Sequence, residues 1–176
     1  MSHVISILDP ETETPAELAP LTQARHLELR FHDVIDEAES VESPAPSHIE
    51  HLLRFTWELH EEGRNTAHLL IHCHAGFSRS PAAAILVLAQ ERPESPADDI
   101  VREIRNARPH IWPNLSMLEI GDRLLDRRGE ITEAAHKLYR SQLRDNPELA
   151  QLMTKYGRAR EVAAGGALSG PLTNHP

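Results

Sequence analysis

The alternation of apolar and polar residues predicts three short strands in the first half of the chain. Residues 4–8 form a short apolar run, and residues 27–31 alternate apolar and polar side chains as a half-buried strand does. Residues 67–72 are apolar almost throughout, which is typical of a central strand covered on both faces. Turn-forming residues follow the first strand to about position 20, and residues 33–46 are acidic and contain prolines. We expect loops in both places.

Helical spacing of the apolar residues begins after the second strand. Ser47, followed by Glu50, has the spacing of a capping box and predicts a helix from there to Gly63. Its apolar stripe consists of Ile49, Leu52, Leu53, Thr56 and Leu59. From Pro81 to about Gln90, an alanine-rich segment predicts a buried helix whose small side chains allow close packing.

Further helices are predicted over residues 95–108, 113–129 and 131–162, the last interrupted at Asn146-Pro147. Strands that alternate with helices predict an α/β fold, in which a small, mainly parallel central sheet is flanked by helices on both faces.

The sequence predicts one domain over residues 1–162, which includes additional C-terminal helices from about residue 130. Residues 163–176 are rich in glycine and other small residues, and we expect them to form a flexible tail.

The only cysteine, Cys73, stands directly after the third strand and just before the alanine-rich helix. Five residues separate it from Arg79, and Ser80 follows. Five residues allow the backbone to curl so that successive N–H groups point at one centre, which is an anion-binding arrangement. The residues that would form this cradle are His74, Ala75, Gly76, Phe77 and Ser78.

The surroundings of Cys73 suit a nucleophile that attacks a phosphate. The N-terminus of the following helix attracts anions, and the planar guanidinium of Arg79 can bind two phosphate oxygens at once. Both features also stabilise a thiolate, so we expect Cys73 to be ionised at neutral pH. Ser80 is placed to donate a hydrogen bond to the thiolate and to cap the helix, and Pro81 fits the first helical turn. Gly76 suits a backbone that needs positive φ.

The stretch from His72-Cys73 to Arg79-Ser80 resembles the signature loop of the cysteine-dependent protein tyrosine phosphatases, nearest to the compact dual-specificity type. The resemblance covers about residues 27–125. It implies a tyrosine-phosphatase-like fold and phosphomonoester hydrolysis through a phosphocysteine on Cys73, with no metal and no cofactor. It also gives His72 the role of hydrogen-bonding the loop and supporting the thiolate. Asn114 lies in a stretch that resembles one following the signature helix, where it either helps to place the water or simply caps a helix.

A general acid that protonates the leaving oxygen contributes about 10²–10⁴-fold to the rate. The resemblance implies that this acid is an aspartate on a loop upstream of the cysteine, after a strand. Asp33 directly follows the second predicted strand and is the best match, with Asp36 as the alternative. Spacing does not fix the direction of a loop carboxylate, and either aspartate can instead merely solvate an acidic loop.

Other readings of the motif fit less well. Low-molecular-weight phosphatases and arsenate reductases carry their loop near the N-terminus, and rhodanese-type sulfurtransferases lack the arginine-serine ending. Inositol-lipid phosphatases tend to have lysines in the loop, where this chain has His74 and Phe77. A Cys/His zinc site needs more ligands than one thiol offers. A pseudophosphatase that binds phosphopeptides without turnover, and a phosphatase for a non-protein ester, remain as alternatives.

Composition narrows the cellular setting and the partners. The chain has 176 residues and a formal net charge of −9, which argues against nucleic acid or an anionic membrane as the main partner. We expect the partner to be a phosphorylated protein or another phosphate ester. A single reactive cysteine suits a reducing cytoplasm, and the N-terminus lacks the pattern of a signal peptide. Lys137 and Lys155 are the only lysines, and the excess of arginine favours a bacterial source.

Overall fold

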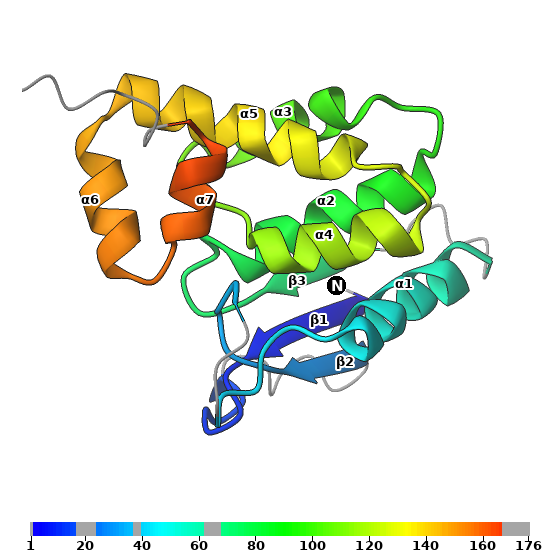
Figure 1. Ribbon diagram of the computed structural model, residues 1–176. Helices are drawn as coiled ribbons and strands as arrows, with labels where there is room; N and C mark the ends of the chain where they lie inside the picture. The colour runs from blue at the N-terminus through cyan, green and yellow to red at the C-terminus, as the bar shows by residue number, and fades with distance from the viewer. Residues whose placement is uncertain (1, 17–23, 37–39, 62–67, 167–176) are drawn as a thin grey trace, which may run out of the picture.

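The computed structural model describes residues 2–16, 24–36, 40–61 and 68–166 (Figure 1). Within them are three strands and seven helices. The strands lie in the first half of the chain, and only helices follow the third strand. In chain order they are β1 (His3–Leu8), β2 (Arg25–Arg30), α1 (Pro46–Glu61), β3 (Leu69–His72), α2 (Arg79–Glu91), α3 (Ala97–Ala107), α4 (Leu115–Leu124), α5 (Glu130–Asp145), α6 (Glu148–Lys155) and α7 (Ala159–Ala164).

The three described strands form a parallel sheet in the order β2-β1-β3. The predicted α/β class with a small parallel sheet is confirmed. The position of the third strand in the sheet was predicted wrongly. In the described sheet β1 is the central strand and is buried along its whole length, whereas β3 lies at the edge and is only half-buried. A continuous apolar run reports the burial of a strand and not its pairing partners, so the sequence could not distinguish the two.

One face of the sheet is apolar, and the other mixes apolar and polar side chains. Ile5, Ile7 and Leu29 point to the first face and share one core with the buried side chains of the helices. Ser6, Glu28 and His72 are paired across the strands on the opposite face. Figure 1 shows α1, α2 and α4 stacked beside the sheet, with α5 forming a further layer over α2 and α4. The helices predicted to flank the sheet are therefore seen on its apolar face.

The start of α1 differs from the predicted capping box. The helix begins at Pro46, so Ser47 lies within its first turn and not at its cap. Ala45 holds the cap position: its carbonyl oxygen accepts from the backbone N–H of His48 at 3.0 Å. In return, Nδ1 of His48 accepts from the N–H of Ala45 at 3.2 Å. Proline is favoured at the first helical position because its missing N–H would have no partner there. The predicted end of this helix at Gly63 and the predicted start of the third strand at residue 67 lie outside the described residues.

The helices after the cysteine follow the predictions with two exceptions at their ends. The helix predicted to run to Gly129 ends at Leu124, and the chain then turns through Asp126 and Arg128 with φ of 50° and 54°. The buried carboxylate of Asp122 stabilises this turn, since it accepts hydrogen bonds from the backbone N–H of Gly129 at 2.6 Å and of Thr132 at 2.9 Å.

The second exception lies in the C-terminal helices. The predicted interruption at Asn146-Pro147 is confirmed as the boundary between α5 and α6. A second interruption, at Gly157 with φ of 76°, separates α6 from α7 and was not predicted. Glycine adopts this left-handed backbone without steric cost, and the resulting turn reverses the chain. Helix α7 extends to Ala164, and residues 167–176 of the predicted tail lie outside the described residues. In the part of the chain that is described, none of the helices has the length and apolar character needed to cross a membrane.

Close packing of α4 against α2 generates a first prediction. A Cβ atom at Gly121 would overlap the side chain of Leu86, which is fully buried on α2. We expect Gly121→Ala to lower the free energy of unfolding by about 1–3 kcal/mol, because the overlap must be relieved within a dense core. Leu124→Ala, on the same helix but at a side chain that is 41% exposed, is the control and should change it far less. Urea denaturation of both variants measures the difference, and equal stabilities would contradict the close contact.

Candidate active site

The loop after β3 has the predicted strand–loop–helix geometry. Cys73 follows the last residue of β3, and Arg79 is the first residue of α2. Gly76 has φ of 63°, as expected for a position that needs a left-handed backbone. On the outside of the loop, Nη2 of Arg108 donates to the carbonyl oxygen of Ala75 at 2.8 Å. A Cβ at Gly76 would lie 2.8 Å from Cζ of Arg108, so glycine also makes room for this brace.

Two hydroxyl groups at the start of α2 serve different partners. Oγ of Ser80 lies 3.3 Å from Sγ of Cys73, which fits the predicted hydrogen bond to the thiolate. The predicted cap at Ser80 is wrong, because the helix begins two residues before Pro81, at Arg79, and Ser78 holds the cap position. The side chain of Ser78 makes no capping hydrogen bond and instead donates to Oδ1 of Asp33 at 2.8 Å. Pro81 lies in the first turn as predicted.

The guanidinium of Arg79 is buried and points to the carboxyl ends of the strands. Nη1 donates to Oδ1 of Asp9 at 2.8 Å and to the carbonyl oxygen of Phe31 at 2.6 Å. Nη2 donates to Nδ1 of His74 at 2.9 Å. Nε is buried and has no hydrogen-bond partner in the described part of the chain. A buried donor without a partner is costly.

Asp9 is a site residue that the sequence analysis did not identify. It follows β1 and lies next to Arg79, and its Oδ2 is 3.7 Å from Nδ1 of His74. Because β1 and β3 are neighbouring parallel strands, residues after their carboxyl ends meet at one edge of the sheet. The position of Asp9 directly after an apolar strand was the signal that could have found it.

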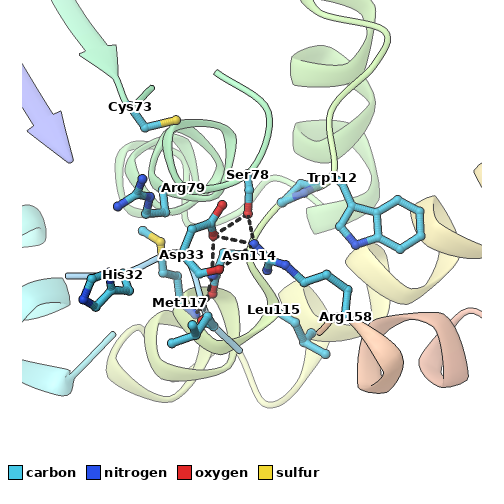
Figure 2. A network of polar contacts seen from close by, with 12 residues as sticks. His32, Asp33, Cys73, Ser78, Arg79, Trp112, Asn114, Leu115, Met117 and Arg158 are labelled. Atoms are coloured by element: carbon cyan, nitrogen blue, oxygen red, sulfur yellow. Dashed lines mark hydrogen bonds and ion pairs between the residues drawn. The ribbon is translucent and has the colours of Figure 1, made fainter. Parts of the chain in front are cut away.

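Asp33 belongs to a cluster of polar side chains beside Arg79 (Figure 2). Its Oδ1 accepts from Ser78 and also from Nδ2 of Asn114 at 2.9 Å, and it lies 2.6 Å from Nη2 of Arg158. Burial raises the pKa of Asp33, but the neighbouring Arg158 guanidinium and the hydrogen bonds from Asn114, Arg158 and Ser78 outweigh it and hold the pKa below the usual range. The carboxyl group is therefore ionised at neutral pH in this state of the protein.

Asp36, the alternative to Asp33, lies apart from this cluster. Its side chain is 63% exposed and pairs with Nε of Arg160 at 2.8 Å. The structure therefore brings Asp33, and not Asp36, together with the loop from Cys73 to Arg79.

Asn114 both caps a helix and contacts the candidate acid. Its Oδ1 accepts from the backbone N–H of Met117 at 3.0 Å at the start of α4. Its Nδ2 donates to Asp33 and to the carbonyl oxygen of Val34. The helix cap is thus confirmed, and a role of Asn114 in placing the water stays a prediction.

The remaining predicted residues have more peripheral positions. Nε2 of His72 lies 2.6 Å from Oγ of Ser6 on β1, so its recorded contact is with the sheet and not with the loop. Nδ1 of His74 lies 2.9 Å from Nη2 of Arg79, and the side chain is exposed. A cavity of about 360 Å³ opens beside Cys73, between the loop and α3. Phe77 is 37% exposed and lines a different cavity, together with Trp112 and Gln142.

Two further residues of the site come from the C-terminal segment. Arg158 and Glu161 are buried, with 6% and 0% of their surface exposed. Oε2 of Glu161 accepts from Nε1 of Trp112 at 2.5 Å, and Oε1 accepts from the backbone N–H of Leu115 at 3.0 Å. Neither residue was identified from the sequence. The available signal was weak: an arginine and a glutamate three residues apart, just after a glycine.

Comparisons with known proteins agree with this geometry. A sequence model of the protein-tyrosine phosphatase family matches residues 41–122, a segment that includes Cys73, Arg79 and Asn114 but neither Asp33 nor Arg158. No curated protein sequence matches the chain.

Solved structures with a similar fold cover most of the chain. The active form of Tk-PTP has a TM-score of 0.52 at 20% identity, over 72% of this chain and 79% of that one. Human tyrosine phosphatase-like serine/threonine/tyrosine-interacting protein has a TM-score of 0.54 at 18% identity, over 73% and 78%. PTPMT1, in complex with PI(5)P, has a TM-score of 0.51 at 17% identity, over 72% and 77%. The resemblance to the cysteine-dependent protein tyrosine phosphatases is thus confirmed in sequence over residues 41–122 and in the fold.

The buried carboxyl of Glu161 generates a prediction for stability. Burial raises its pKa from 4.5 to about 7, although Arg158, the Leu115 amide and the Trp112 indole all act to lower it. The folded state therefore binds the proton more tightly than the unfolded state, and stability declines as the pH rises from about 4.5 to about 7. A shift of this size corresponds to up to about 3 kcal/mol. Asp33 does not produce this decline, since its lowered pKa makes stability fall only as the pH drops below the usual carboxyl range.

Urea denaturation at pH 5 and pH 7 tests this assignment. Glu161→Gln should flatten the decline between the two pH values, whatever its absolute stability. Glu50→Gln, at an exposed position on α1, should retain the decline of the unsubstituted protein. An unchanged slope in the Glu161 variant would contradict the assignment.

Proposed function

We propose that this protein is a phosphatase that hydrolyses phosphomonoesters, in the first place phosphotyrosine in proteins, through a phosphocysteine intermediate on Cys73. The observation that carries the proposal is the arrangement around Arg79. Its guanidinium is buried beneath the loop that begins at Cys73, three of its contacts fix its position, and its Nε has no partner among the described residues. Such a group binds the equatorial oxygens of a phosphate and stabilises them as phosphorus is attacked.

The proposed reaction has two displacement steps. In the first, the Cys73 thiolate forms a bond to phosphorus, the ester P–O bond breaks, and Asp33 gives its proton to the leaving oxygen. In the second, the Asp33 carboxylate takes a proton from water as the water attacks phosphorus, and the S–P bond breaks to release phosphate and the thiolate. Ser80 stabilises the thiolate in both steps through its contact with Sγ. No metal or cofactor takes part in this scheme.

The low pKa of Asp33 has to be reconciled with a role as an acid. The carboxyl is ionised, because Arg158 and three hydrogen bonds stabilise the charge. A phosphate dianion beside it disfavours a second negative charge and raises the pKa. The proton therefore enters together with the substrate, and we expect turnover to be greatest on the acidic side of neutrality.

The loop favours a singly phosphorylated ester over a multiply phosphorylated one, because it contains no lysine that would bind additional phosphates. Serine and threonine phosphates are compatible with the same mechanism. A non-protein phosphate ester is the second candidate substrate, favoured by the similarity in fold to PTPMT1, which was crystallised with PI(5)P. A phosphopeptide-binding protein without turnover is disfavoured, because the loop retains both Cys73 and Arg79.

The nucleophile is tested by Cys73→Ser. This variant should lose hydrolysis of a small aryl phosphate, because a serine hydroxyl is not ionised in this loop. It should still bind inorganic phosphate, measured by calorimetry, with an affinity close to that of the unsubstituted protein, since Arg79 and the loop amides are intact. Hydrolysis that persists in the variant would show that Cys73 is not the nucleophile.

The general acid is tested by comparing Asp33→Asn with Asp36→Asn. Loss of the acid should slow esters with poor leaving groups by about 10²–10⁴-fold and activated esters much less. Asp36 is the matched control, because it lies on the same loop and is exposed. The measurement is kcat/KM for a series of aryl phosphates with different leaving-group pKa. If Asp36→Asn, and not Asp33→Asn, shows the dependence on the leaving group, then Asp36 is the acid.

A further inference from the structure

The carboxylate of Asp33 is held through one of its two oxygens. Ser78, Asn114 and Arg158 all contact Oδ1. Among the described residues, none donates a hydrogen bond to Oδ2. A carboxyl group held in this way has a fixed orientation and keeps one oxygen available to carry a proton. Three donors on one oxygen therefore suit an acid that must be aimed at a leaving group.

Of these three donors, only Arg158 carries a charge, and it belongs to the C-terminal segment between α6 and α7. Its Nη2 lies 2.6 Å from Oδ1 of Asp33 and donates to the backbone carbonyl of the same residue at 2.9 Å. It also donates to Oγ of Ser78 at 3.2 Å. One guanidinium nitrogen thus contacts both the loop that carries Asp33 and the loop from Cys73 to Arg79. The residues are 125 positions apart in the sequence for Asp33 and 80 for Ser78.

Arg158 is itself fixed from behind. Its Nη1 donates to Oε1 of the fully buried Glu161 at 3.3 Å. Glu161 in turn accepts from Trp112 and Leu115, which flank Asn114. The C-terminal segment, through Arg158, and the residues around Asn114 therefore hold the carboxylate of Asp33 from two sides.

A second arginine, Arg160 on α7, contacts the part of the loop that follows Asp33. Nη2 of Arg160 donates to the carbonyl oxygen of Ile35 at 2.6 Å, and Nε pairs with Asp36. Nη1 reaches Oε1 of Glu119 on α4 at 2.5 Å. The loop between β2 and α1 has no regular structure around Asp33. Contacts with α7 therefore help to hold this segment near the loop from Cys73 to Arg79.

We propose that Arg158 is the positioning residue for the general acid Asp33, so that the C-terminal helical segment completes the active site. The inference rests on the proposed function and adds to it a residue outside the signature loop. Arg158 does not contact the reacting atoms and acts through Asp33. The charged groups around this carboxyl are Arg158 with Glu161 behind it, and Arg79 on α2, whereas Ser78 and Asn114 are neutral.

Removal of the Arg158 charge has two expected consequences. The carboxyl of Asp33 loses its fixed direction, which slows the step that needs a proton on the leaving oxygen. Arg158 also acts to lower the pKa of Asp33. Without it, Asp33 remains protonated to higher pH, and the descending limb of the pH profile of kcat moves to higher pH.

The test compares Arg158→Met with Arg158→Lys in the full chain. We expect Arg158→Met to slow esters with poor leaving groups by roughly 10–100-fold, part of the full contribution of a general acid. Activated esters and the binding of inorganic phosphate should change less than about threefold, because Arg79 is untouched. Arg158→Lys keeps the charge and should return the descending limb of the pH profile toward its original position. Arg144→Met, at an arginine that is 76% exposed on α5, is the control and should behave as the unsubstituted protein does.

A double-mutant cycle separates positioning from general damage to the fold. In the Asp33→Asn background, Arg158→Met should cost little further activity, because the residue through which it acts is already disabled. Equal losses for activated and poor leaving groups, or full additivity of the two substitutions, would overturn the inference. A protein that hydrolyses no phosphate ester at all would instead contradict the proposed function. An Arg158→Met variant with normal phosphate binding and an unchanged pH profile would refute the positioning role of Arg158 and leave the proposed function intact.

Discussion

The buried guanidinium of Arg79 is the group around which the rest of the site is arranged. Its contacts reach Asp9 after β1, the Phe31 carbonyl after β2, and His74 in the loop after β3. One side chain therefore connects the carboxyl ends of all three described strands. A buried cation is tolerated only when such partners surround it, and their positions in turn fix the direction in which it can donate. The parallel sheet supplies those partners because its strands end together.

A second buried arginine has a complementary task. Arg79 is held by groups that follow the strands, whereas Arg158 is held by Glu161 and faces the Asp33 carboxylate. Ser78 lies at the junction, since its backbone belongs to the phosphate loop and its hydroxyl contacts Asp33. Breaking one partner of a buried charge pair leaves the other uncompensated, so both arginines resist displacement. In the proposed reaction, the first cation binds the phosphate and the second orients the general acid.

Much of the fold followed from patterns within short stretches of sequence. The α/β class, the parallel sheet and the break at Asn146-Pro147 were predicted because periodicity and proline act locally. Errors arose where a local pattern has two outcomes. Ser47 had the spacing of a cap but lies inside α1, since Pro46 takes the first helical position. The apolar run at β3 indicated burial correctly, yet pairing placed that strand at the edge of the described sheet.

The sequence by itself determined the phosphate loop, because Cys73, Gly76, Arg79 and Ser80 are neighbours whose spacing sets the curvature of the backbone. Only the tertiary structure decided which carboxylates meet that loop. Asp9 is 70 residues from Arg79, and Asn114 is 81 residues from Asp33. Such contacts leave no periodicity in the sequence, since they depend on where strand ends and helix ends come together in space. Local chemistry is therefore encoded in adjacent residues, and the choice of the acid is made by packing.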